Sequence, residues 1–193
     1  MEKTLYVSDL DGTLLNRQSR LPPFTQQALN RLLEKGMLFT FATARSWHSA
    51  HVAAQGLSPS LPWIIHNGAA FANGKTGVRT GEVFFTYPQR KKILDSCVRR
   101  QLWPLVYSVR QGEEKVFYLK DAPLHEGMKH YIDSRPGDPR LAQVAGLEEL
   151  LQGGTYYFTF IHTKEALAPL WEELKDLPWL NLTFQQELYR QEY

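Results

Sequence analysis

The sequence predicts an α/β fold, with a parallel sheet in its N-terminal part and a mixed α+β domain after it. Residues 5–65 alternate short apolar segments with helix-like segments, which is the pattern of strand–helix–strand units. From about residue 81 this alternation gives way to a mixed order of hairpins and helices. We therefore expect two domains, residues 1–81 and residues 82–193.

The first apolar segment, Leu5–Val7, is followed by two carboxylates, Asp9 and Asp11. Its side chains suit a short buried strand, and Gly12 marks the place where the chain must turn away. Asp9, Asp11 and Thr13 would then lie just beyond the carboxyl end of a strand. In open α/β sheets, that edge is where ligands bind.

The two neighbouring carboxylates indicate a bound cation. Carboxylates this close repel each other, and a divalent cation relieves the repulsion. Mg²⁺ prefers hard oxygen ligands and is commonly held together with a substrate phosphate, so Asp9 and Asp11 indicate phosphoryl chemistry. An EF-hand loop starting at Asp9 is excluded, because Leu14 and Arg20 would replace its glycine and its bidentate glutamate. The alternative is a solvated turn that caps the strand.

Further elements follow from apolar spacing. A helix is predicted to begin at Pro22–Pro23, since proline is tolerated in a first helical turn, and to end at Gly36. Apolar residues recur in it at helical spacing: Phe24, Ala28, Leu29, Leu32 and Leu33. Residues 37–43 are almost continuously apolar, which predicts a strand of a sheet covered on both faces. A helix over residues 46–55 and a strand over residues 63–66 complete the alternation.

The second strand ends in Thr43-Ala44-Arg45. Adjacent parallel strands bring their carboxyl ends together, so Thr43 could offer its hydroxyl and backbone N–H to a phosphoryl oxygen that faces Asp9. Thr43 could instead cap the helix that follows. Arg45 could bind phosphate or form an ion pair at the surface.

The third strand ends in Asn67-Gly68-Ala69. An amide at this edge could orient a hydroxyl or a phosphate, but Asn-Gly is also the strongest short marker of a hairpin turn. Both interpretations stay open. A second pair, Asn73-Gly74, lies between two short segments and predicts a hairpin.

The second domain is expected to begin with a helix after Pro88 and to contain a hairpin around Gln111-Gly112. Further helices are expected at residues 125–133, 147–152 and 165–174, and strands at residues 156–162, 180–184 and 188–193. The single cysteine, Cys97, cannot form an internal disulfide, and we interpret it as a packing residue of the first helix.

Composition limits the possible partners. The net charge of +2 comes from 22 basic and 20 acidic residues spread along the chain, which does not indicate nucleic-acid binding. The longest apolar stretch is far too short to cross a bilayer, and the first predicted strand leaves no room for a signal peptide. We therefore expect a cytoplasmic protein without a membrane partner.

The segment Asp9-Leu-Asp-Gly-Thr-Leu-Leu15 resembles the signature of the haloacid dehalogenase-like phosphatases. Thr43-Ala44-Arg45 is similar to the second motif of their Cof-type branch, which is commonly Thr-Gly-Arg, and Asn67-Gly68-Ala69 resembles a substrate-side segment of that branch. The resemblance implies a Rossmann-like parallel core with an inserted α+β cap. The cap would close over the core and select the substrate.

The resemblance further implies a Mg²⁺-dependent phosphatase acting on a small phosphorylated metabolite. Asp9 would attack phosphorus and form an aspartyl phosphate, and Asp11 would protonate the leaving oxygen and then activate water. Mg²⁺ would be held by Asp9 and the backbone carbonyl of Asp11. The residues expected to contact substrate or its phosphate are Thr13, Thr43, Ala44, Arg45 and Asn67.

Two alternatives stay open: phosphomutase chemistry, and a binding module that holds a phosphorylated ligand without turnover. Dehalogenation is disfavoured, since that reaction needs neither Mg²⁺ nor a carboxylate at Asp11.

The resemblance also implies a lysine and a Gly-Asp pair with a following Asp after the cap, and we do not find them in the sequence. Gly137-Asp138 is followed by Pro139-Arg140, and we do not expect it to bind metal. We expect the 193 residues to be a shortened piece of a longer phosphatase rather than a naturally short relative that has lost catalysis. The core sheet would then be incomplete, and its uncovered edge could allow self-association.

Overall fold

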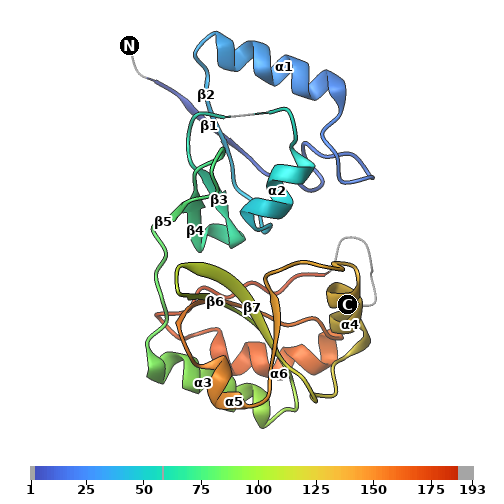
Figure 1. The fold of residues 1–193 in the computed structure, drawn as a ribbon, viewed down its shortest axis with the longest axis vertical. Helices are drawn as coiled ribbons and strands as arrows, with labels where there is room; N and C mark the ends of the chain where they lie inside the picture. Colours follow the sequence, from blue (N-terminus) through green and yellow to red (C-terminus); the bar gives the residue numbers. More distant parts are fainter. Residues whose placement is uncertain (1–2, 58, 187–193) are drawn as a thin grey trace. The chain divides into compact units, whose positions relative to one another are not determined.

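The structure is a computed structural model that describes residues 3–57 and 59–186, which form two compact units (Figure 1). Unit 1 ends at Val83, and unit 2 begins at Phe84. This division lies close to residue 81, where the sequence pattern changes. Both units combine helices with strands, and each contains a parallel strand pair, so the predicted α/β class is confirmed.

Unit 1 is built on three parallel strands followed by two antiparallel ones. Its elements are β1 (Leu5–Ser8), α1 (Pro23–Glu34), β2 (Leu38–Phe41), α2 (Trp47–Ala53), β3 (Trp63–Ile65), the 3₁₀ turn η1 (His66–Gly68), β4 (Ala70–Ala72) and β5 (Arg79–Thr80). β1 pairs with β2 in parallel, and a single parallel bridge between Ala42 and Ile64 joins β2 to β3. β4 pairs antiparallel with both β3 and β5. The strand–helix alternation predicted for this part is confirmed.

The core of unit 1 gathers the buried side chains of β2, β3 and α2. The ring of Phe41 meets the ring of Trp63 edge-to-face at 5.0 Å, and both side chains are almost fully buried. Leu10, which follows β1, is also fully buried in this core. The core therefore anchors the chain between the two aspartates of the N-terminal motif.

Two expectations about burial in unit 1 are wrong. Leu5, Tyr6 and Val7 are about half exposed, although a buried strand is predicted there, because β1 pairs with β2 alone among the described strands. Phe24 is 82% exposed, although it belongs to the apolar stripe of the first helix. Of that stripe, Leu29 and Leu33 pack against the core.

The predicted hairpin after residue 69 is confirmed, but its connection is longer than a two-residue Asn-Gly turn. The amide of Asn73 donates to the carbonyl of Val78 at 2.8 Å. The side-chain oxygen of Asn73 accepts from the amides of Lys75 and Thr76, both at 3.0 Å. The side chain of Asn73 thus stabilises the six-residue loop between β4 and β5.

Unit 2 contains a four-stranded sheet with the order β8-β7-β6-β9. Its elements are α3 (Tyr87–Val98), β6 (Leu105–Arg110), β7 (Glu113–Leu119), α4 (Glu126–Asp133), β8 (Leu141–Val144), α5 (Leu147–Leu150), β9 (Gly154–Thr159) and α6 (Lys164–Leu174). In Figure 1, α3 and α6 lie together along one face of the sheet, and buried Ile93, Cys97 and Leu170 fill the space where they meet.

Most predicted elements of unit 2 are confirmed. The turn between β6 and β7 is Gln111-Gly112, with φ angles of 53° and 80°, as a two-residue hairpin requires. Two findings differ from the prediction. Residues 141–144 form a strand that was not predicted, and residues 180–184 form no regular strand. The strand expected at residues 188–193 lies outside the described residues.

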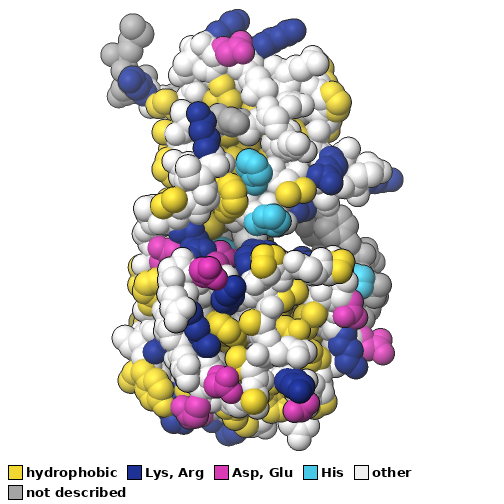
Figure 2. All heavy atoms as spheres, in the orientation of Figure 1, with side chains coloured by type: hydrophobic (Ala, Val, Ile, Leu, Met, Phe, Trp, Pro, Cys, Tyr) yellow, Lys and Arg dark blue, Asp and Glu magenta, His cyan; other side chains and the backbone are white. Residues whose placement is uncertain are grey.

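The surface carries charges of both signs. On the face shown in Figure 2, acidic side chains lie beside basic ones over unit 2. Among residues 3–57 and 59–186, no helix is long and apolar enough to cross a membrane.

Candidate active site

Backbone hydrogen bonds hold the carboxyl ends of the three parallel strands together. The amide of Ala42 donates to the carbonyl of Ser8 at 2.9 Å, and the amide of Asn67 donates to the carbonyl of Thr43 at 3.0 Å. The residues just beyond β1, β2 and β3 therefore lie along one edge of the sheet. Asp9, Thr43 and Asn67 are the residues that sequence analysis places at this edge.

A tight turn follows Asp9. The carbonyl of Leu10 accepts from the amides of Leu14 at 3.0 Å and Leu15 at 2.9 Å. Gly12 has a φ of 77°, and a side chain there would meet no atom within 4 Å, so backbone conformation rather than space favours glycine. The turn leaves Asp9 and Thr13 exposed and Asp11 half-buried.

Asp9 has an available carboxylate. Its backbone carbonyl accepts from the hydroxyl of Ser8 at 2.9 Å. Within the part of the chain that the structure describes, its carboxylate makes no hydrogen bond or ion pair. An exposed, unpaired carboxylate at a sheet edge can act as a nucleophile or as a metal ligand.

Asp11 is held in a different way, by Arg45. The guanidinium donates from Nε to Oδ2 and from NH2 to Oδ1, both at 2.7 Å, while the two side chains are 21% (Arg45) and 18% (Asp11) exposed. Arg45 also donates from NH1 to the hydroxyl of Ser49 at 3.0 Å. A bidentate pair fixes both the position and the plane of the carboxylate. Sequence analysis leaves two roles open for Arg45, phosphate binding and an ion pair. The structure contains the ion pair.

The side chain of Thr43 is buried and accepts a hydrogen bond from its own loop. Thr43 is 4% exposed, and its hydroxyl accepts from the amide of Arg45 at 3.2 Å. The alternative role of Thr43 as a helix cap is wrong, because Ser46 caps α2 by accepting from the amide of Ser49 at 3.3 Å. Ala44 is exposed beside it.

Asn67 lies in the connection between β3 and β4. Its φ of 54° and that of Gly68, 89°, are left-handed, as an Asn-Gly turn requires. Its exposed side chain is compatible with the second interpretation, contact with a ligand. Neighbouring His66 is buried, and its amide donates to the carbonyl of Arg45 at 3.0 Å.

Two residues of this site were not predicted, Ser49 and His66. Ser49 could have been found, because it lies four residues after Arg45 at the start of a predicted helix. The sequence contains no signal for His66, whose contact depends on the turn after β3.

The oxygen donors at this edge meet part of what Mg²⁺ requires. The described residues contain no group of three or more His, Cys, Asp or Glu side chains that could hold a metal. Mg²⁺ needs only one or two carboxylates when water and a substrate phosphate complete its shell. Asp9 fits as one such ligand, whereas both carboxylate oxygens of Asp11 are engaged by Arg45. Asp138 pairs with Arg140 at 2.7 Å.

Comparisons with solved structures concern the fold. A haloacid dehalogenase-like hydrolase from Bacteroides thetaiotaomicron has a TM-score of 0.67 at 16% identity, over 91% of this chain and 64% of that chain. A sugar phosphatase of haloacid dehalogenase subclass IIB has a TM-score of 0.65 at 18% identity, over 90% of this chain and 64% of that one. The fold of this chain is thus that of haloacid dehalogenase-like proteins.

Sequence relatives agree with this fold. A proposed phosphatase from Mycoplasma genitalium is 24% identical over 77% of this chain and 49% of its own length. Another, from Buchnera aphidicola, is 32% identical over 48% of this chain and 29% of its own length. The chain therefore spans half or less of the length of these relatives.

A family model matches most of the chain. The model describes haloacid dehalogenase-like hydrolases, and it matches residues 6–187. As its N-terminal motif predicts, the chain belongs to the haloacid dehalogenase-like hydrolases, in their Cof-type branch.

Proposed function

We propose that the protein is a Mg²⁺-dependent phosphatase that acts on small phosphorylated metabolites through an aspartyl phosphate on Asp9. One observation carries the proposal: Asp9 is exposed and unpaired among the described residues, and the second carboxylate of the motif, Asp11, is fixed two residues away. Phosphoryl transfer through an aspartate needs one free carboxylate for attack and a second for proton transfer.

The proposed reaction has two steps. An Asp9 oxygen attacks phosphorus, the bond from phosphorus to the leaving oxygen breaks, and that oxygen takes a proton from Asp11. Asp11 can carry this proton only when one of its oxygens is released from Arg45. Water then attacks the phosphorus of the aspartyl phosphate and gives a proton to Asp11, which releases inorganic phosphate and restores Asp9. Arg45 acts as a positioning residue, because its two bonds orient Asp11. Mg²⁺, held by Asp9 and the backbone carbonyl of Asp11, would neutralise phosphoryl charge when bound.

The remaining predicted site residues are assigned to the substrate side in this proposal. Thr13, Thr43, Ala44 and Asn67 would contact the phosphoryl group or the substrate from the sheet edge. Unit 1 would be the N-terminal part of the core, and unit 2 would be the cap. The name of the similar sugar phosphatase supports a small metabolite as substrate. We also propose a cytoplasmic location.

Release of inorganic phosphate from an aryl phosphate tests the proposal. The 193-residue chain and the longest reading frame that contains it are assayed with Mg²⁺ and with a chelator. Asp9→Asn preserves shape but removes the nucleophile, so we expect the rate to fall on the order of 10⁴-fold. Asp121→Asn is a matched control, since Asp121 is exposed in unit 2.

The outcomes separate the candidate functions. Phosphate release that needs Mg²⁺, is lost in Asp9→Asn and persists in Asp121→Asn supports the proposal. Equal rates in the two variants would contradict it. Binding of a phosphate ester without any release, in both lengths of chain, would support a binding module instead.

A further inference from the structure

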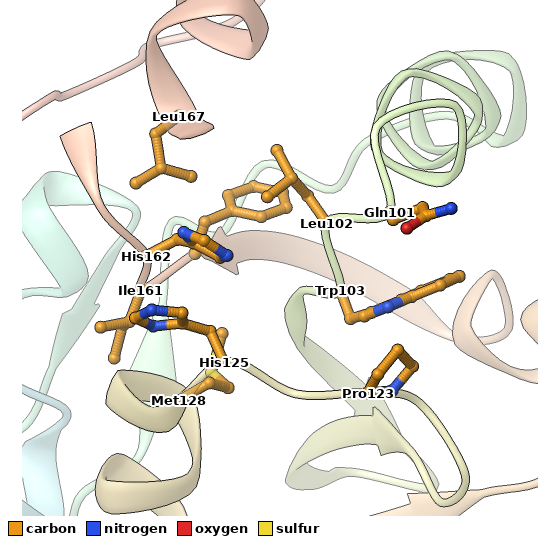
Figure 3. Close-up of a pocket in the computed structure, with 10 residues that line it drawn as sticks. Gln101, Leu102, Trp103, Pro123, His125, Met128, Ile161, His162 and Leu167 are labelled. Atoms are coloured by element: carbon orange, nitrogen blue, oxygen red, sulfur yellow. The ribbon is translucent and has the colours of Figure 1, made fainter. Parts of the chain in front are cut away.

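Two histidines of unit 2 stack on each other beside a small pocket (Figure 3). The ring centroids of His125 and His162 are 3.8 Å apart, and the ring planes differ by 30°. The pocket has a volume of about 20 Å³, which is room for about one water molecule. Of the described residues that line it, only the two histidines have titratable side chains.

Each histidine accepts a hydrogen bond at the start of a helix. His125 is the N-cap of α4, and its Nδ1 accepts from the amide of Gly127 at 3.2 Å. The Nδ1 of His162 accepts at 2.8 Å from the amide of Thr163, the N-cap of α6, whose own side chain makes no capping bond. An Nδ1 that accepts from N–H carries no proton, so these bonds assign the neutral tautomer with its proton on Nε2 to both rings.

Proton uptake by either ring opposes this arrangement. A proton on Nδ1 turns the acceptor into a donor that faces a backbone N–H, so the hydrogen bond is lost. The new charge lies at the positive end of a helix macrodipole, in α4 or in α6. Two protonated rings would also place like charges at the stacking distance of 3.8 Å.

The two helices that carry the rings have charges of both signs near their starts. α4 carries Glu126 and Lys129 in its first turn, and α6 carries Lys164 and Glu165, so each helix start has one acid and one base. The pocket-lining segment 101–103 adds no charged side chain. Burial, and then the neighbouring His125, lower the pKa of His162 below its ordinary value of 6.5.

We propose that His125 and His162 form a pH-sensitive latch, which ties the start of α4 to the start of α6 while both rings are neutral. When the pair takes up a proton, the stacked rings separate and the hydrogen bonds that the rings accept from the amides of Gly127 and Thr163 are lost. The pocket beside the rings then opens, because both rings and the two helix starts form part of its wall. The latch lies in unit 2, outside the proposed catalytic residues, and is independent of them.

The direction of the pH effect follows from His162. Its folded-state pKa lies below the unfolded value, so the unfolded chain binds more protons below about pH 6.5. The latch therefore contributes its full stability above that pH. The contribution is lost as pH falls from there through the folded-state pKa of His162.

A titration by nuclear magnetic resonance on the 193-residue chain tests the latch directly. Between about pH 8 and about pH 5, we expect the imidazole signals of His162 to change together with the amide signals of Gly127 and Thr163. We also expect an apparent pKa below 6.5 for His162. Amide signals that stay constant while the rings titrate would overturn the proposal.

A double variant, His125→Asn with His162→Asn, provides the second test. Asparagine oxygen accepts the same backbone N–H groups but does not titrate, so the caps remain and the pH response of the latch disappears. The midpoint of thermal unfolding of the wild-type chain is expected to fall between about pH 7.5 and about pH 5.5, and that of the double variant to fall less over the same range. His130→Asn, at an exposed position on α4, is the control, and its midpoint of thermal unfolding should fall as in the wild type. If the midpoint of thermal unfolding of the double variant falls as much as that of the wild type, the latch is contradicted.

Discussion

Asp9 and Asp11 are two residues apart in the sequence, yet their environments differ at the level of single atoms. The carboxylate of Asp9 is exposed and unpaired among the described residues, whereas both oxygens of Asp11 accept from Arg45. The difference arises because Leu10 between them is fully buried and turns the chain. The exposed carboxylate of Asp9 supports the proposed role of nucleophile, whereas Asp11 must release one oxygen from Arg45 before it can carry a proton.

Replacing Arg45 tests its positioning role. Arg45→Lys keeps the positive charge but cannot form the bidentate pair, so we expect kcat to fall about tenfold, with KM nearly unchanged. Arg45→Ala also leaves Asp11 without its partner, and unfolding in urea should show a loss of about 1–3 kcal/mol. Equal kcat values in wild type and Arg45→Lys would contradict the role.

Cys97 offers a test of packing at a single site. Its side chain is fully buried in α3, and burial raises the pKa of its thiol to about 12. We expect a thiol reagent at about pH 8 to modify the native chain far more slowly than the chain in urea, since only the thiolate reacts. Equal rates in the two conditions would show that this part of unit 2 is not packed as described.

Prediction from sequence was strongest for side chains that follow directly from a strand. Asp9, Thr43 and Asn67 were expected at one sheet edge, and backbone bonds bring the residues beyond β1, β2 and β3 together there. The pairing of Asp11 with Arg45 was not predicted. It depends on how the chain turns between β2 and α2, and two roles for Arg45 stayed open on sequence alone.

At the scale of elements, one carboxylate joins α3 to α6. Glu173 on α6 accepts from Lys92 at 3.0 Å, from Arg99 at 2.8 Å and from Arg100 at 2.6 Å. The hydroxyl of Ser96 also donates to it at 2.6 Å. These bonds, that of Ser96 first, lower the pKa of Glu173 from 4.5 to about 2. The charged group therefore stabilises the packing of the two helices.

Removing that charge is expected to weaken unit 2. Glu173→Gln should lower the free energy of unfolding near neutral pH by about 1–2 kcal/mol, a value reduced for solvent screening of the exposed lysine and arginine partners. Since the folded pKa is depressed, the stabilisation is present above pH 4.5 and is lost as pH falls toward about 2. The measurement is urea unfolding as a function of pH.

Glu172→Gln is the matched control, because Glu172 pairs only with Lys175 among the described residues. It should change stability by less than about 0.5 kcal/mol. Equal effects of the two variants would show that the cluster around Glu173 adds nothing.

Elements with strong local signals were predicted well, and weak ones were not. The hairpin at Gln111-Gly112 was found because a two-residue turn has its own sequence signature. β8 was missed because Leu141–Val144 is short and is a strand only through its parallel pairing with β7. The sequence pattern of residues 180–184 predicts a strand, but these residues do not form one. Instead, Leu180 and Leu182 pack against the cluster between α3 and α6.

For the whole molecule, the division into two units has a testable consequence. Residues 81–84 lie outside the helices and strands, and Val83 is 82% exposed. We expect elastase, which cuts after small aliphatic residues, to cut first after Val83 and to release the two units as fragments. Val83→Asp should abolish that cut. A first cut inside either unit would contradict the division.

The extent of each unit's exposed surface could not be read from the sequence. Apolar residues of β1 predict a buried strand, but Leu5, Tyr6 and Val7 are about half exposed in unit 1. Burial depends on what lies beside a strand, and local sequence does not contain that information. Self-association through the free edge of β1 stays a prediction.

The central claim is that Asp9 carries the phosphoryl group, and trapping that intermediate tests it most directly. The protein is mixed with a phosphate ester labelled at phosphorus, quenched within the first turnover and digested, and the labelled peptide is identified. We predict that the label lies on the peptide that contains Asp9, and that borohydride reduction before digestion converts this aspartate to homoserine. Release of phosphate with the label on another residue, or with no labelled peptide at all, would contradict the account.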